Sequence, residues 1–255
     1  MKTIIFWYRK KRKKTLIATA LFIPILFAFL LALRLINGST GSFNDPGTGM
    51  IVIDPGHGGV DGGASYGGFL EKEINLSISR RLKNLLEKKG FQVVLTRDRD
   101  ESLESLSPED GSRHQRDLSA RAAKINGLDA QLFLSIHVNS NKNNPNACGS
   151  IVYYGTKIEQ SSVLANCVQH SLNCIETDAA GRDTHASQTG DFFLLNNTRI
   201  PGVLIETAFI TNYSERQLLA EDEFRDRIAA AIVEGVLAYY ERIGIEKPKA
   251  AERMS

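Results

Sequence analysis

The longest hydrophobic run in the chain lies near its start. Residues 15–33 form nineteen consecutive positions without a charge. As a helix this run extends over roughly 28 Å, close to the thickness of a bilayer's hydrocarbon core. Its apolar residues cover every face, which a buried helix of a soluble domain does not require. The pattern therefore predicts a transmembrane helix over residues 15–36.

From residue 50 onward, short apolar runs alternate with segments of helical periodicity. Strand-like runs fall at 50–54, 91–96, 131–136, 151–154 and 203–206, and amphipathic helical patterns at 71–89, 118–126, 161–175 and 221–240. Such alternation predicts a single α/β domain over residues 50–243, with a mostly parallel, twisted sheet and helices on both faces. The long polar stretch 98–117 is expected to form a surface excursion or flap.

Charge near the N-terminus sets the expected topology. Seven Lys and Arg residues precede Thr15 with no acid among them. The positive-inside rule therefore places residues 1–14 in the cytoplasm and the domain on the extracytoplasmic face of the membrane. We expect 15–36 to be an uncleaved signal-anchor, because the apolar run exceeds that of a signal peptide and Arg34-Leu35-Ile36 is a poor cleavage site. Cleavage, the alternative, would release the domain as a secreted protein.

Two polar segments flank the predicted domain, and its charge excludes one class of partner. Residues 37–49 are rich in Gly, Ser and Pro and read as a linker, and residues 244–255 read as a polar tail. The formal net charge of the chain is +2. Without the basic N-terminal cluster the remainder is mildly acidic, so we expect no nucleic-acid partner.

Candidate metal ligands fall where the predicted strands finish. His57 follows the first strand, His137 and Glu206 end two later strands, and Glu71 begins the first helix of the domain. The carboxyl ends of parallel strands meet at one edge of a sheet, so these side chains should converge there. Two His and one Glu with an open position form a common catalytic zinc set, and the second Glu can act as general base and acid. Position alone does not assign the two carboxylates.

A purely structural role for the two histidines is the alternative to a metal site. A single His at a strand end is more often a hydrogen-bonded core residue than a ligand. The metal site is favoured because His57 and His137 are both expected at one edge of the sheet, and because His57 lies inside a Pro-Gly-His-Gly-Gly turn. Seven glycines fall between residues 56 and 68. No G-K-[ST] follows them, so a loop that lets backbone approach a metal is favoured over a phosphate cradle.

At this point the sequence resembles the zinc-dependent N-acetylmuramoyl-L-alanine amidases, which hydrolyse peptidoglycan. Four blocks carry the resemblance: 51–59, 70–76, 135–139 and 203–212. The resemblance implies that His57, Glu71 and His137 bind Zn²⁺ and that Glu206 is the catalytic carboxylate. Glu73 is the rival to Glu71, but it lies about 200° away round a helix, so both cannot face one metal. The motif favours Glu71.

Within that family the chain is most similar to the germination-specific, CwlD-type amidases of spore-forming bacteria. The N-terminal anchor, the bare catalytic domain and the insert within 106–118 carry this likeness. It implies cleavage of the amide bond between N-acetylmuramic acid and L-alanine in spore cortex peptidoglycan. Whether an activating protein partner exists stays open, because no motif identifies one.

Three alternatives stay open at this level. Asn139 is a candidate for holding the glycan-peptide substrate, although it equally suits a turn after a strand. The chain can be another zinc peptidase or deacetylase of the cell wall. It can also be a wall-binding module without activity, a reading that the presence of Glu206 disfavours.

Overall fold

The computed structural model describes residues 49–107, 109–176, 181–246 and 248. These belong to a compact unit that extends from Pro46 to Ser255. The expected basic segment, the membrane segment 15–36, residues 37–48 of the linker and most of the tail lie outside the described residues. Within the described part of the chain, no helix is both long and apolar enough to cross a bilayer.

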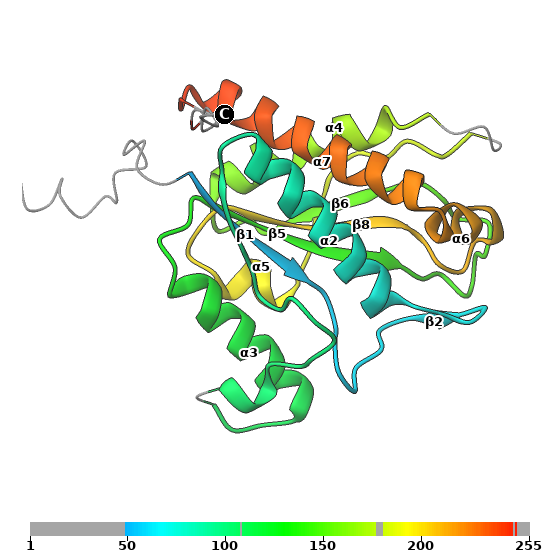
Figure 1. The fold of residues 1–255 in the computed structure, drawn as a ribbon, viewed down its shortest axis with the longest axis horizontal. Helices are drawn as coiled ribbons and strands as arrows, with labels where there is room; N and C mark the ends of the chain where they lie inside the picture. Colours follow the sequence, from blue (N-terminus) through cyan, green and yellow to red (C-terminus); the bar gives the residue numbers. More distant parts are fainter. Residues whose placement is uncertain (1–48, 108, 177–180, 247, 249–255) are drawn as a thin grey trace, which may run out of the picture. The chain divides into compact units, whose positions relative to one another are not determined.

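A six-stranded sheet forms the centre of the domain (Figure 1). Its strands lie in the order β4 (Gln92–Leu95), β1 (Met50–Pro55), β5 (Leu132–Asn139), β8 (Gly202–Phe209), β6 (Ile151–Tyr154) and β7 (Gln188–Thr189). The pairs β1–β4, β1–β5, β5–β8 and β6–β7 are parallel, whereas β6–β8 is antiparallel. The sheet is therefore mixed rather than uniformly parallel.

The antiparallel strand follows from the connection that precedes it. Residues 140–150, all of them described, contain no helix between β5 and β6. A parallel return needs a crossover of a dozen or more residues, usually a helix. The short loop carries the chain back in the opposite direction, so β6 pairs with the far side of β8 in reverse.

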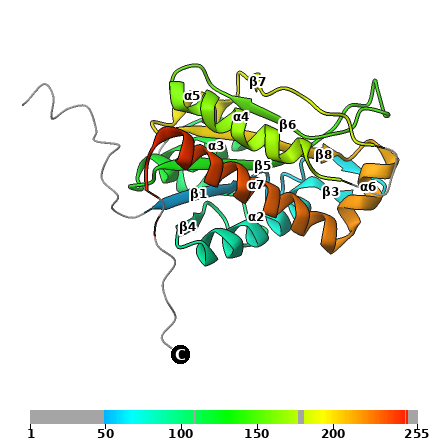
Figure 2. The same cartoon turned by 90° about the horizontal axis from the view of Figure 1, so that it is seen from above.

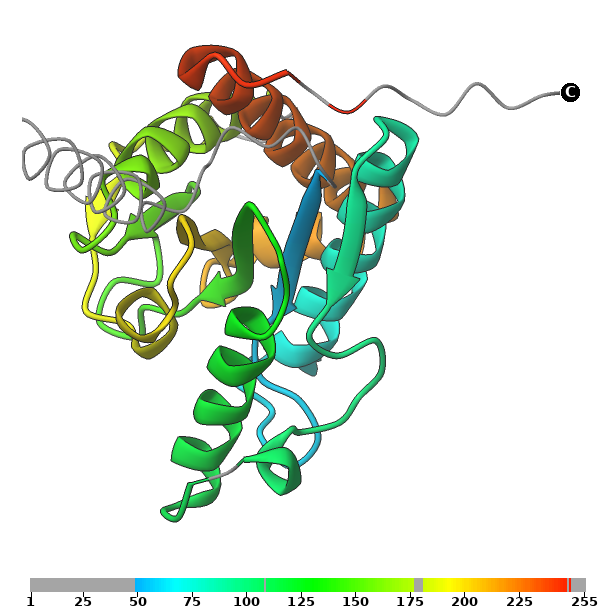
Figure 3. The same ribbon diagram turned by 90° about the vertical axis from the view of Figure 1, so that its left-hand side faces the viewer.

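Helices cover both faces of the sheet, as predicted. One face carries α2 (Glu71–Lys88), α4 (Glu159–Asn173) and α7 (Asp222–Ile243), and the other carries α3 (Arg113–Asn126) and α5 (Phe193–Asn197). Figure 3 shows the domain from another side, with the two layers of helices separated by the sheet. The helix α7 packs between α2 and α4 (Figure 2). The α/β architecture expected from the alternating pattern is thus confirmed.

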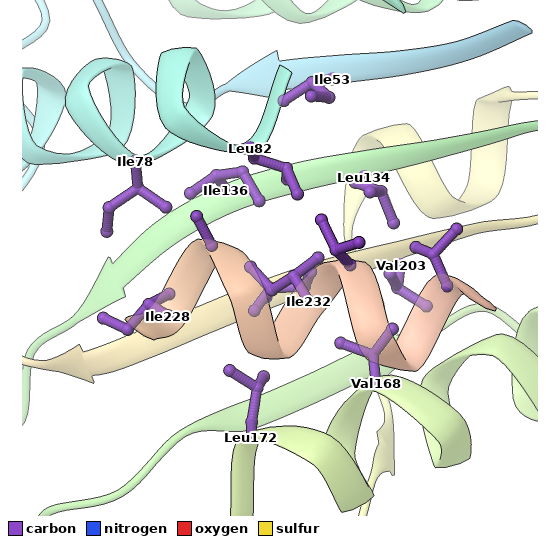
Figure 4. Close-up of a cluster of buried hydrophobic side chains, with 14 of the residues drawn as sticks. Ile53, Ile78, Leu82, Leu134, Ile136, Val168, Leu172, Val203, Ile228 and Ile232 are labelled. Carbon is purple, nitrogen blue, oxygen red and sulfur yellow. The ribbon is translucent and has the colours of Figure 1, made fainter. Parts of the chain in front are cut away.

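Side chains point alternately to the two faces of the sheet, so a hydrophobic core forms on each face. Ile51 and Ile53 of β1 face α2 and α7, while Val52 between them faces α3. Figure 4 shows Ile228 and Ile232 of α7 among the larger cluster, with Leu172 of α4 below them in that view. Burial on both faces explains why the strands read as continuous apolar runs.

Some predicted boundaries are wrong. Both β5 and β8 continue past the apolar runs, so His137 and Glu206 lie within strands, where they pair with each other. The helix α3 begins at Arg113 rather than Leu118, because Ser112 and Gln115 form a capping box. The chain also forms short elements that the pattern did not indicate: β2 (Ser65–Tyr66), β3 (Phe69–Leu70), η1 (Glu104–Leu106) and α6 (Tyr213–Ala220).

Hydrogen bonds tie the described part of the polar stretch, residues 98–107 and 109–117, to the rest of the domain. The Asp100 carboxylate accepts hydrogen bonds from the Gly59 amide and from Lys72 Nζ, each at 2.8 Å. The Asp117 carboxylate accepts one from the Leu103 amide at 2.6 Å. Asp100 thus joins the stretch to the glycine-rich loop and to α2, and the Leu103–Asp117 bond links two parts of the stretch itself.

Candidate metal centre and cleft

The glycine-rich loop after β1 presents the His57 side chain. His57 has φ +61°, a conformation that no other non-glycine residue adopts among those described. A Cβ on Gly56 would lie 2.2 Å from the His137 ring, and one on Gly63 would lie 2.6 Å from Glu71 Oε2. The two glycines therefore let the loop approach the other candidate ligands, as the sequence analysis expected.

The structure brings His57, Glu71 and His137 together. Glu71 Oε1 lies 3.2 Å from His57 Nε2 and 3.0 Å from His137 Nδ1. One ligand atom from each residue lies within 4.8 Å of the other two. The imidazole rings are nearly perpendicular, with centroids 5.1 Å apart. Three donor atoms thus converge on one point.

Of the two acids in the first turn of α2, the structure favours Glu71 over Glu73. Glu71 is buried and Glu73 is exposed. The Ala64 amide donates to Glu71 Oε2 at 2.7 Å, and the Val138 amide donates to Oε1 at 3.2 Å. Burial alone would raise the pKa of Glu71, but hydrogen bonds from His137 and His57 and their charges lower the pKa below its usual range. Glu71 is therefore an anionic donor.

Asp61, which the sequence pattern did not indicate, contacts the ring nitrogen of His57 that does not face Glu71. Its Oδ2 lies 2.8 Å from His57 Nδ1, and its Oδ1 accepts a hydrogen bond from the Gly63 amide at 3.0 Å. Burial would lower the pKa of His57, but Glu71 and then Asp61 raise the pKa to about 9. A carboxylate on the second ring nitrogen is the usual support of a His ligand. An acid four residues after the His was the available signal.

Glu206 stands beside this cluster on the neighbouring strand. It pairs with His137 in the β5–β8 register. Its side chain is half-buried, but Oε2 is inaccessible and has no hydrogen-bond partner among the described residues. Burial, with a smaller contribution from the negative charge of Glu71, raises the pKa of Glu206 to about 7, against the opposing charge of His137 and His57. A carboxyl group with that pKa exchanges a proton near neutral pH.

A cleft of about 390 Å³ opens over these residues. Its walls come from opposite sides: α3 contributes His114 and Leu118, and the segment leading into α5 contributes Phe192 and Phe193. An adjoining pocket of about 490 Å³ extends beside His57, between the loop and the start of α3. The two pockets share His57, Asp61, His114 and Asp117.

Asn139 lies at the carboxyl end of β5 and lines the cleft. Its Oδ1 accepts a hydrogen bond from the Ser140 amide at 2.8 Å, which is the turn contact that the sequence left as one alternative. The position also suits contact with a substrate, so both roles are compatible with the geometry.

Two imidazoles and an ionised carboxylate surround one point, and a separate carboxyl group of raised pKa lines the cleft beside them. This arrangement is typical of metal-dependent hydrolases. Comparison with known proteins gives the family. The family model for N-acetylmuramoyl-L-alanine amidases matches residues 51–238, and the chain belongs to this family. It is an N-acetylmuramoyl-L-alanine amidase by class.

Several relatives match nearly their whole length. The germination-specific N-acetylmuramoyl-L-alanine amidase of Bacillus subtilis is 34% identical over 239 residues, covering 92% of this chain and 98% of that protein. The CwlD amidase of Clostridioides difficile, solved in complex with the GerS lipoprotein, has a TM-score of 0.69 at 31% identity, covering 76% of this chain and 98% of that one. The amidase AmiC2 of Nostoc punctiforme has a TM-score of 0.63 at 34% identity, covering 76% and 97%.

Proposed function

We propose that this chain is a zinc-dependent amidase that hydrolyses the bond between N-acetylmuramic acid and L-alanine in peptidoglycan, with His57, Glu71 and His137 as zinc ligands and Glu206 as catalytic residue. The observation that carries the proposal is the convergence of those three donors beside Glu206, whose Oε2 has no hydrogen-bond partner in the described part of the chain. Family membership supports the bond that is cut.

The donor set fits zinc. Two imidazole nitrogens and one carboxylate oxygen are typical of catalytic zinc sites, which leave a fourth position open. The second nitrogen of His57 already bonds to Asp61, which fixes the ring's tautomer and direction. A zinc ion held there supplies Lewis-acid polarisation of a carbonyl and lowers the pKa of a water molecule.

The chain's own residues handle the proton. Glu206 accepts a proton from the attacking water and then donates it to the departing L-alanine amine. The Glu206 side chain lines the cleft, and its pKa near 7 allows either protonation state. Glu71 stays ionised because its hydrogen bonds and the neighbouring imidazoles favour the charged form. The two carboxylates therefore have different roles.

The finer biological role rests on similarity. The B. subtilis relative is named as germination-specific and matches over nearly its full length, which supports a role in the spore cortex during germination. The C. difficile relative is solved with a lipoprotein, which supports a protein partner of that kind for this chain. We further propose that residues 15–36 anchor the domain at the extracytoplasmic face of the membrane, with residues 1–14 in the cytoplasm.

Product analysis on purified peptidoglycan tests the proposed reaction. Hydrolysis at the expected bond releases peptides with a free N-terminal L-alanine and leaves the lactyl carboxyl of muramic acid free. A peptidase would instead expose other amino termini, and a deacetylase would release acetate. Binding without any product would identify a wall-binding module and refute the proposal.

The proposed anchoring of the protein in the membrane requires a separate measurement. The protein should fractionate with membranes and keep its N-terminal segment. N-terminal sequencing that begins near residue 38 would instead show a cleaved signal peptide and a secreted enzyme.

A further inference from the structure

The backbone of the first ligand loop is held in an unfavourable conformation. His57 adopts φ +61°, in the left-handed region that L-residues other than glycine seldom occupy. Such a conformation persists only where surrounding groups impose it. The carbonyls of residues 55–57 accept side-chain hydrogen bonds from Asn75 of α2 and from two arginines, and the arginines donate most of these bonds.

Arg121 of α3 holds the loop from one side. Its Nη2 donates to the His57 carbonyl at 2.6 Å, and its Nη1 donates to the Pro55 carbonyl at 2.8 Å. Its remaining contacts are ionic: Nη1 lies 2.7 Å from Asp54 Oδ1, and Nε lies 2.6 Å from Asp117 Oδ2. Every guanidinium nitrogen of Arg121 is therefore engaged.

Arg97, which follows β4, holds the same loop from the other side. Its Nε donates to the Pro55 carbonyl at 2.9 Å. Its Nη2 donates both to the Gly56 carbonyl and to the Lys72 carbonyl, each at 2.9 Å. Lys72 follows Glu71 in the first turn of α2. One nitrogen thus ties the loop that carries His57 to the turn that carries Glu71.

The positive charges of the two arginines must be compensated within the protein. Both side chains are almost completely buried, at 1% exposure. Buried charges are costly unless they are paired or hydrogen-bonded. Arg121 forms ion pairs with Asp54 and Asp117, and Arg97 donates to backbone carbonyls. The planar guanidinium presents its donors from three nitrogens in a fixed fork, whereas the donors of a lysine ammonium all lie on one nitrogen. A lysine therefore cannot reproduce the spread of carbonyl contacts that each arginine makes.

We propose that Arg97 and Arg121 are positioning residues of the metal site, which hold the carbonyls of residues 55–57 so that the His57 ring faces Glu71 before a metal binds. This inference rests on the proposed zinc site and adds to it two residues that bind neither metal nor substrate. Three consecutive carbonyls, 55, 56 and 57, each accept from one or both guanidinium groups.

The test measures zinc affinity of the 255-residue chain by competition with a chromogenic chelator, for the wild type, Arg121→Lys and Arg97→Lys. Loss of a group that orients a ligand weakens metal affinity about 10- to 100-fold. We expect that range for both variants. At excess zinc, kcat should return to within about threefold of wild type with KM unchanged, because the ligands and Glu206 remain.

Leu172→Ala is the matched control for lost stability. Leu172 is buried between α4 and α7 and lines neither pocket. Its truncation leaves a cavity and lowers Tm, but zinc affinity should remain within about twofold of wild type. A general loss of stability is thereby separated from a loss of ligand orientation.

The outcomes are distinct. If the wild type binds zinc and cleaves peptidoglycan while both lysine variants bind zinc equally well, the positioning role is refuted and the proposed function stands. A raised KM that excess zinc does not restore would instead give Arg121, which also lines the cleft, a role in substrate binding. A wild type without zinc affinity would overturn the proposed function, and this inference with it.

Should a lysine variant fail to fold, Asp117→Asn replaces it. This change removes the outer ionic partner of Arg121 while every guanidinium stays in place. We expect zinc affinity to fall at least threefold. A folded Asp117→Asn protein with unchanged zinc affinity would refute the inference.

Discussion

Replacement of Glu206 by Gln should lower the rate of catalysis and raise the stability of the folded protein. Gln keeps the shape of the side chain, and Oε2 has no described hydrogen-bond partner to lose. General acid–base catalysis contributes about 10²–10⁴ in rate, and here one carboxyl group acts in two transfers. We therefore expect kcat to fall toward the upper end of that range, about 10³–10⁴, with zinc content unchanged.

The stability effect follows from the raised pKa. Burial moves the pKa of Glu206 from 4.5 to about 7, so folding disfavours the ionised form. The resulting destabilisation is absent below pH 4.5, grows as the pH rises, and is complete above pH 7. At about 1.4 kcal/mol per pH unit, the maximum is about 3 kcal/mol. Gln cannot ionise and should remove this cost.

The assay is chemical denaturation of zinc-free wild type and Glu206→Gln at pH 5 and pH 8, alongside turnover with zinc restored. The variant should be more stable at pH 8, and the difference should shrink at pH 5. Glu71→Gln is the contrast, because a neutral amide is a poor ligand and zinc affinity itself should fall. The reasoning fails if Glu206→Gln loses zinc while Glu71→Gln retains it, or if Glu206→Gln shows no gain in stability at pH 8.

Three further outcomes can be checked. His57→Ala and His137→Ala should each abolish stoichiometric zinc by elemental analysis; full occupancy in the double variant would contradict the assigned ligand set. Asp61→Asn should weaken zinc affinity about 10-fold or more with the fold intact, and equal affinity by chelator competition would exclude a supporting role. Burial would raise the pKa of Asp54, but the charge of Arg121 and three hydrogen bonds lower the pKa from 3.8 to about 2. Asp54 should therefore contribute about 2 kcal/mol that is present above pH 4 and lost as the pH falls toward 2, as seen by comparing acid unfolding of wild type and Asp54→Asn.

Much of the architecture could be predicted because it depends on local periodicity. Apolar runs of strand length between amphipathic helices indicate an α/β sheet, and parallel strands end at a common edge. That geometry suffices to bring His57, Glu71 and His137 to one place. The strand limits were less accurate, because pairing with β8 extends β5 beyond its apolar run to Asn139. The direction of β6 depended on how its preceding loop re-enters the sheet.

The sequence by itself determined which residue types reach the site, whereas the tertiary structure decided how each is held there. Burial of Glu71 and exposure of Glu73 follow from how α2 sits on the sheet. The Asp61 support depends on the turn of the loop, and Arg97 and Arg121 lie 40 and 64 positions after His57 in the chain. Their side chains bind backbone carbonyls, which every residue possesses, so no pattern of side chains marks the contact. Only the fold brings those carbonyls within reach of a guanidinium.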